Sequence, residues 1–256
     1  MRDPHVESLR YRLETSVTTT YKDPPAVEVI RDEFECRLSD GVLTCRMKKH
    51  YPTVEEARRV IDDFLRSWEI KTALELGRDE MQFQFEDSHM VDRDPPPPGS
   101  SQIVRVYAAS VGVSTLLGRV HVTRNTYPGA PTTFAVTPDV ETLWQRYENY
   151  LDGREPLPSM AYFCLTVVEN KAGSRRNAAK EYSIDKRILD KLGELTSTRG
   201  DTRTARKALK GGSTATLSGK EKNWIEGAVR ALIRRTGEVA STQPVPRITM
   251  SDLPEI

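Results

Sequence analysis

The chain has 256 residues, and its 38 Lys and Arg face 37 Asp and Glu, which leaves a formal net charge of +1 at pH 7. Hydrophobic residues make up 37% and charged residues 29%, a composition typical of a globular protein with one large or two modest cores. No stretch approaches the ~20 apolar residues needed to cross a bilayer, and the N-terminus lacks the apolar core of a secretory signal. We therefore expect a cytoplasmic protein with no membrane partner.

The first elements are predicted to form an antiparallel sheet. Residues 9–19 alternate apolar and polar side chains, which predicts a half-exposed strand. Asp40 and Gly41 lie at the centre of residues 33–48, and this pair suits a two-residue type I′ hairpin turn. Folding about that turn places three apolar pairs on one face of the hairpin, namely Phe34 with Met47, Cys36 with Cys45, and Leu38 with Leu43.

A helix is predicted over residues 53–68, where Thr53 and Glu56 have the spacing of a capping box and apolar residues recur every three or four positions. Residues 70–76 alternate and end at Gly77, which predicts a short strand paired with a second one over residues 81–86.

Four consecutive prolines in residues 94–101 predict a polyproline II loop, with docking into an aromatic-lined groove of a partner as the alternative. Further strands are predicted over residues 102–113 and 116–123.

The second half of the chain is predicted to be helical. Thr137 is an N-cap residue followed by proline, and Ser218 with Glu221 forms another capping box. Helices are expected over residues 138–151, 158–168, 185–195 and 218–237, the last of them stopping at Gly237. The predicted fold class is α+β. Its parts are a mainly antiparallel sheet with one packed helix in residues 1–135, a helical bundle in residues 136–240 and a flexible tail in residues 241–256.

Few residues are arranged for catalysis or metal binding. None of the four histidines, His5, His50, His89 and His121, forms a pair with metal-ligand spacing. Cys36 and Cys45 are interpreted as reduced core neighbours that could form a disulfide only in an oxidising setting, and Cys164 as a packing residue. No nucleotide-binding glycine loop or nucleophile elbow is present. We therefore predict no metal and no cofactor, and the sequence names no catalytic residue.

Positive charge is concentrated in residues 171–210, where twelve Lys and Arg face five Asp and Glu, an excess of +7. Guanidinium groups suit bidentate contacts with phosphate. The candidate contact residues for RNA or for an acidic protein surface are Arg175, Arg176, Arg199, Arg203, Arg206 and Lys207. In the alternative, these arginines form salt bridges with acidic residues of the first half, within the chain or across a homo-oligomer.

The order of elements in residues 157–240 resembles that of HEPN-like helical domains: a buried helix, a shorter helix, an Arg-rich segment and a final amphipathic helix. The resemblance implies a place in bacterial stress or phage-defence systems. Ribonucleases of this family use an arginine followed a few residues later by a histidine. Here the matching arginine is Arg199 or Arg176, but neither is followed by a histidine, and Glu181 and Tyr182 follow Arg176 instead.

The sequence therefore favours a non-enzymatic binding or assembly protein whose contact surface is the basic stretch. The alternative is a diverged HEPN-type ribonuclease that acts on RNA, in which another group would have to replace the missing histidine.

Overall fold

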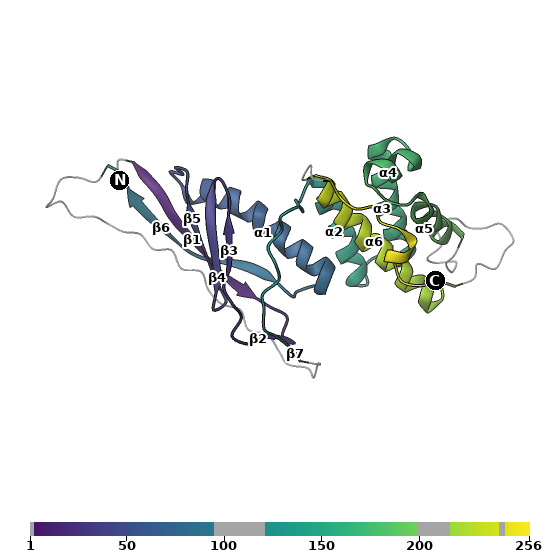
Figure 1. The fold of residues 1–256 in the computed structure, drawn as a ribbon, viewed down its shortest axis with the longest axis horizontal. Coiled ribbons are helices and arrows are strands. Elements are labelled where there is room, and N and C mark those ends of the chain that lie inside the picture. Colours follow the sequence, from purple (N-terminus) through teal and green to yellow (C-terminus); the bar gives the residue numbers. More distant parts are fainter. Residues whose placement is uncertain (1–2, 95–120, 199–215, 241–243) are drawn as a thin grey trace. The chain divides into compact units, whose positions relative to one another are not determined.

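The computed structural model describes residues 3–94, 121–198, 216–240 and 244–256. The predicted strand over residues 102–113 and most of the one over residues 116–123 lie outside these ranges, as do the prolines of residues 95–98. The chain divides into two compact units, Met1–Pro131 and Thr132–Ile256. The first contains an antiparallel sheet and one helix, and the second is helical, so the predicted α+β class is confirmed (Figure 1).

A five-stranded antiparallel sheet forms the first unit, with the strand order β3-β4-β5-β1-β6. Its strands are β1 (Pro4–Glu14), β3 (Val27–Ile30), β4 (Phe34–Ser39), β5 (Val42–Met47) and β6 (Gln82–Asp92). Two short strands, β2 (Thr19–Tyr21) and β7 (Val122–Arg124), pair in parallel as a separate ribbon. The single predicted strand over residues 9–19 is therefore divided between β1 and β2.

The hairpin of β4 and β5 has the predicted register. Cys36 lies opposite Cys45 and Leu38 opposite Leu43. Asp40 and Gly41 have φ values of 52° and 73°, as a type I′ turn requires at both central positions. The alternating side chains of both strands then place one apolar face toward the core.

The helix α1 (Val54–Leu76) covers that apolar face of the sheet. Thr53 caps its N-terminus, because the Thr53 hydroxyl accepts a hydrogen bond from the Glu56 backbone N–H. The buried residues of α1 that meet the sheet recur at helical spacing and are Ala57, Ile61, Leu65 and Trp68. Each fully buried large apolar side chain of this kind contributes about 1.5–3 kcal/mol.

The strand predicted over residues 70–76 is wrong, because α1 continues to Leu76 and ends at Gly77, whose φ is 120°. Ile70 and Leu74 are both buried one helical turn apart, and no turn residue stands between Trp68 and Ile70 to stop the helix. The strand predicted from residue 81 does exist as β6, but it pairs with β1.

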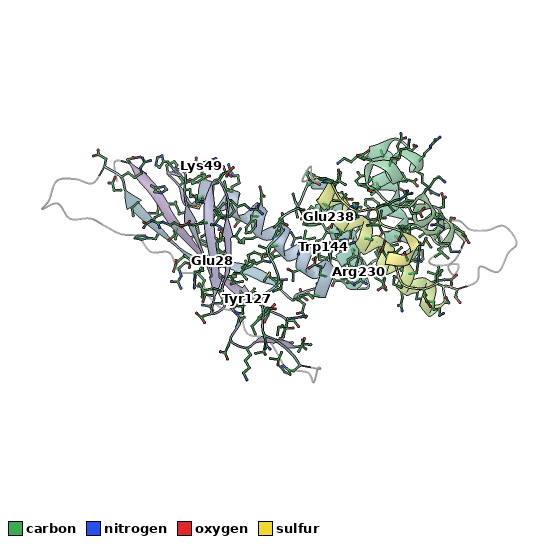
Figure 2. The ribbon with its side chains drawn as sticks, viewed as in Figure 1. Glu28, Lys49, Tyr127, Trp144, Arg230 and Glu238 are labelled. Carbon is green, nitrogen blue, oxygen red and sulfur yellow. The ribbon has the colours of Figure 1, made fainter. Side chains whose placement is uncertain are left out.

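Helices packed around α3 make up the second unit (Figure 1). They are α2 (Pro138–Leu151), α3 (Leu157–Ala172), α4 (Arg175–Glu181), α5 (Lys186–Thr198) and α6 (Gly219–Val239), followed by the 3-10 turn η1 (Met250–Asp252). Its core side chains include Trp144, labelled in Figure 2, which is 2% exposed. Thr137 and Ser218 cap α2 and α6 as predicted.

Gly237 does not end the last helix, as the sequence predicted, because α6 runs on to Val239. Gly237 is instead needed for close packing. A Cβ atom added there would lie 2.3 Å from a ring carbon of Phe134.

Residues 244–256, expected as part of a flexible tail, pack against the bundle. Ile248 is 3% exposed and forms a parallel bridge with Ile184. The Ile248 N–H donates to Ser183 O at 2.9 Å, and the Asp185 N–H donates to Ile248 O at 2.8 Å. Arg235, itself 2% exposed, donates to Pro246 O at 2.6 Å. We call residues 244–256 the C-terminal strap.

Candidate nucleic-acid interface

Two of the six candidate contact residues lie in the described part of the chain. Arg175 and Arg176 form the first turn of α4. Arg199, Arg203, Arg206 and Lys207 fall in residues 199–215, outside the described ranges, so their role stays a prediction.

Arg175 is used inside the bundle. Its guanidinium group bonds Glu169 of α3 and lies 3.4 Å from Asp190 of α5. The group also lies over Gly193, where an added Cβ would be 2.8 Å from an Arg175 nitrogen. Burial opposes the charged form, but the hydrogen bonds with Glu169 and Asp190 raise the pKa of Arg175 overall. Arg175 therefore joins three helices, and its guanidinium group is engaged by Glu169 and Asp190.

Its neighbour Arg176 points away from the bundle. Arg176 and Lys180 lie one turn apart on the exposed side of α4, whereas Ala178 and Tyr182 are buried. Within the described ranges, no ion pair or hydrogen bond involves either the Arg176 or the Lys180 side chain. A short helix thus holds both cations at a fixed spacing, and neither has an anionic partner among the residues that the structure describes.

A second group of cations gathers around Asp185, directly before α5. Its carboxylate accepts hydrogen bonds from the backbone N–H of Arg187 at 3.0 Å and from the Arg187 guanidinium at 2.6 Å. Arg247 of the C-terminal strap lies 4.0 Å away. The bonds from Arg187, with support from Arg247, lower the pKa of Asp185. The Arg187 and Arg247 side chains are 74% and 62% exposed, so one carboxylate is shared by two accessible guanidinium groups.

Sequence reasoning missed Arg247 because it assigned the residue to a flexible tail. Arg247 comes next to Arg187 only through the bridge between Ile184 and Ile248, which are far apart in the chain. The one available signal was the sequence Val245-Pro-Arg-Ile248, in which isolated apolar residues follow a polar linker.

Salt bridges occupy part of the basic stretch, but the described ones do not involve acidic residues of the first half, with which the alternative paired them. In residues 171–198, seven Lys and Arg face four Asp and Glu. Five of these cations have described carboxylate partners: Lys171, Arg175, Lys186, Arg187 and Lys191. All of those partners belong to the helical unit itself, at residues 139, 169, 185, 190 and 194.

The residues around Arg176 offer little for acid–base chemistry. Tyr182 stands near the place where the ribonuclease pattern needs a histidine, but it is 3% exposed and burial raises the pKa of its hydroxyl. Across the described ranges, no group of three or more His, Cys, Asp or Glu residues could hold a metal ion.

Three histidines have polar partners near the end of the sheet where β1 begins and β6 ends. The His50 Nε2 atom lies 3.2 Å from Asp3, and His89 Nδ1 lies 2.7 Å from Glu7. His5 accepts a hydrogen bond from the Tyr51 N–H at 3.4 Å. Burial, together with the nearby His50, lowers the pKa of His5.

No protein-family model matches the chain, and comparisons with curated proteins and with solved structures found no match. Among the helices in the described part of the chain, none combines the length and apolar character needed to cross a bilayer.

Proposed function

We propose that the protein binds RNA without cleaving it, through a basic surface on its helical unit. This basic surface consists of Arg176, Lys180, Arg187 and Arg247. The observation that carries the proposal is the pair of Arg176 and Lys180, which lie exposed on one side of α4 with no described partner. Their charges contribute nothing evident to the packing of the bundle, whereas Arg175 next to them does.

The chemistry of the surface favours phosphate. Arginine offers a planar fork of N–H donors that can hold two phosphate oxygens at once. Arg187 and Arg247 share a single carboxylate, so a phosphate group can take one of the two guanidinium groups without leaving Asp185 unpaired. Because the whole chain carries a net charge of only +1, attraction must come from this local excess and weaken steeply with salt.

RNA is favoured over an acidic protein surface because the cations are exposed and have no apolar centre among the described residues: none of the exposed large hydrophobic side chains lies in α4 or α5. Protein interfaces generally have such a centre, whereas phosphate backbones are bound by scattered Lys and Arg. The HEPN-like resemblance adds a setting to the proposal, bacterial stress or phage defence. The absence of a histidine after Arg176 supports binding without cleavage.

The test is the salt dependence of binding to a fluorescent single-stranded RNA. We compare a double variant, Arg176→Ala with Lys180→Ala, and a matched control, Lys22→Ala with Arg59→Ala. The control removes the same charge from exposed positions of the first unit. Because the double variant neutralises two fewer phosphates, its slope of log K against log salt should be shallower by about 1.4, while the control keeps the wild-type slope. Equal slopes for both variants would contradict the proposal.

The same samples separate binding from cleavage. Intact RNA after incubation without added metal supports a binding protein. Shortened RNA whose formation disappears in Arg176→Ala or Arg199→Ala establishes the alternative, a diverged HEPN-type ribonuclease.

A further inference from the structure

The outer edge of β3 presents main-chain hydrogen-bonding groups that no described strand uses. β3 is the first strand in the sheet order, so its one paired neighbour is β4 (Figure 1). The Arg31 N–H donates to Phe34 O at 2.9 Å, and hydrogen-bonded pairs alternate along an antiparallel ladder. Val29 therefore directs its N–H and C=O toward β4, while Glu28 and Ile30 direct theirs outward.

The same two residues border a shallow groove on the sheet face opposite α1. The groove has a volume of about 510 Å³, and its wall includes Glu35, Arg37 and Arg46. Ile30 at its rim is 74% exposed, more than any other large hydrophobic residue in the described part of the chain. An exposed apolar side chain beside free main-chain groups favours a partner that adds a strand.

Charge in the groove is balanced. Arg37 pairs with Glu28, labelled in Figure 2, and Arg46 lies 3.9 Å from Glu35. All four side chains are at least 45% exposed. Two arginines and two glutamates do not attract a polyanion, so this surface is distinct from the basic surface of the helical unit. Its chemistry suits a peptide held mainly by its backbone.

A second copy of the chain fits this edge poorly. Three two-fold antiparallel registers bring the outward groups of the two β3 strands together. In the first, Glu28 faces the Glu28 of the second copy. In the second, Ile30 faces the Ile30 of the second copy, but Glu28 faces Asp32 on both sides of this apolar pair, again like against like. The third places Glu28 against the apolar Ile30, which leaves neither residue with a matching neighbour.

We infer that the outer edge of β3 accepts an extended segment of a partner protein by antiparallel strand addition. The segment carries an apolar residue, then any residue, then a basic residue. In this register, the apolar side chain lies opposite Ile30 and covers it, and the basic side chain lies opposite Glu28. Backbone hydrogen bonds with Glu28 and Ile30 supply the affinity, and the two side chains supply the preference.

Fluorescent peptides test the inference on the full chain by anisotropy. One peptide has Ile-Thr-Lys at its centre and the other has Ile-Thr-Glu in an otherwise identical sequence. The first should bind roughly two- to tenfold more tightly, because an opposite-charge pair replaces a like-charge pair across the strands. In Glu28→Lys the preference should reverse, a result that a general loss of folding cannot produce.

A proline variant tests the backbone contacts. Ile30→Pro removes an N–H that points away from the sheet, so the internal ladder keeps its hydrogen bonds. Peptide affinity should fall at least roughly fivefold, while Ile30→Val, the matched control, keeps it. Circular dichroism checks that both variants are folded.

Three outcomes would overturn the inference. The first is unchanged peptide binding by a folded Ile30→Pro variant. The second is the absence of any reversal in Glu28→Lys. The third is a wild-type dimer that Ile30→Pro converts to a monomer in light scattering, since the edge would then be occupied by a second copy.

Discussion

The two units differ in how they use surface charge. On the open face of the sheet, charges meet as cross-strand pairs, such as Arg37 with Glu28 and Arg12 with Glu86. In the helical unit, Arg175 bonds two carboxylates while Arg176 beside it bonds none that the structure describes. Balanced charge suits a scaffold or a peptide-binding edge, and unbalanced charge suits contact with a polyanion. Position within an element, rather than residue type, decides which of these uses an arginine has.

The largest expected effect concerns the packing that holds the helical unit together. Gly237→Ala places a Cβ atom 2.3 Å from Phe134, and we expect a loss of about 2–3 kcal/mol in the free energy of unfolding. Gly219→Ala, in open space at the start of the same helix, should be neutral or stabilising. Urea denaturation measures both. Adding Phe134→Leu to Gly237→Ala should recover part of the loss. If the double variant instead loses the sum of the two single losses in free energy of unfolding, Gly237 and Phe134 do not pack against each other.

A smaller effect is expected at the hairpin turn of the first unit. Gly41 has a φ of 73° with nothing near its Cβ position, so Gly41→Ala should lower the free energy of unfolding by about 1 kcal/mol through backbone strain alone. Gly129→Ala, also in open space but without a positive φ, is the control. Equal denaturation midpoints for the two variants would show that the turn is not type I′.

Lowering the pH should destabilise the helical unit, because it protonates Asp190. The hydrogen bond from Lys186, with support from Arg175, lowers the pKa of Asp190 below its usual 3.8. Because the pKa of Asp190 is lower in the folded state than in the unfolded state, its carboxylate stabilises the fold at any pH above the unfolded pKa. This stabilisation disappears as the pH falls below about 4. Hydrogen exchange of α4 and α5 should therefore accelerate over that range. Asp190→Asn should flatten the dependence, and an unchanged profile in that variant would rule out this carboxylate as the cause.

The smallest effect is expected for the exposed pair of Glu28 and Arg37. Both side chains are more than 60% exposed, and surface pairs of this kind contribute about 0–1 kcal/mol. Arg37→Ala should change the denaturation midpoint very little, and the loss should shrink further in high salt. If Arg37→Ala lowers the free energy of unfolding by more than Gly41→Ala does, the stability of the sheet depends on its cross-strand ion pairs.

Local chemistry explains which parts of the fold were predictable. The hairpin at Asp40 and Gly41 could be predicted because its turn residues and its apolar pattern agree within a few residues of each other. The end of α1 could not, because Thr72, Leu74 and Leu76 fit a strand while Ile70 and Leu74 fit a helix equally well. Only burial in the folded structure shows whether these residues follow the two-residue period of a strand or the 3.6-residue period of a helix.

The candidate site was predictable only as a stretch of charge. Arg175 and Arg176 are adjacent residues of the same type, so the sequence does not distinguish them. Their different roles arise because the fold brings Asp190 and Gly193 beside Arg175. The position of Arg247 beside Arg187 could not be predicted from the isolated apolar residues around it, because it depends on one bridge between distant isoleucines. Gly237 was misassigned for the same reason, since the ring of Phe134 that requires it lies far away in the sequence.

The most direct test compares Arg175→Ala with Arg176→Ala in two measurements on the same protein, the free energy of unfolding and the affinity for single-stranded RNA. We predict that Arg175→Ala lowers the free energy of unfolding by about 1 kcal/mol, since its pairs are partly exposed, and leaves RNA affinity unchanged. Arg176→Ala should leave stability unchanged and weaken RNA binding severalfold at low salt. The opposite assignment of the two effects, or RNA affinity that neither variant changes, would contradict the proposed basic surface.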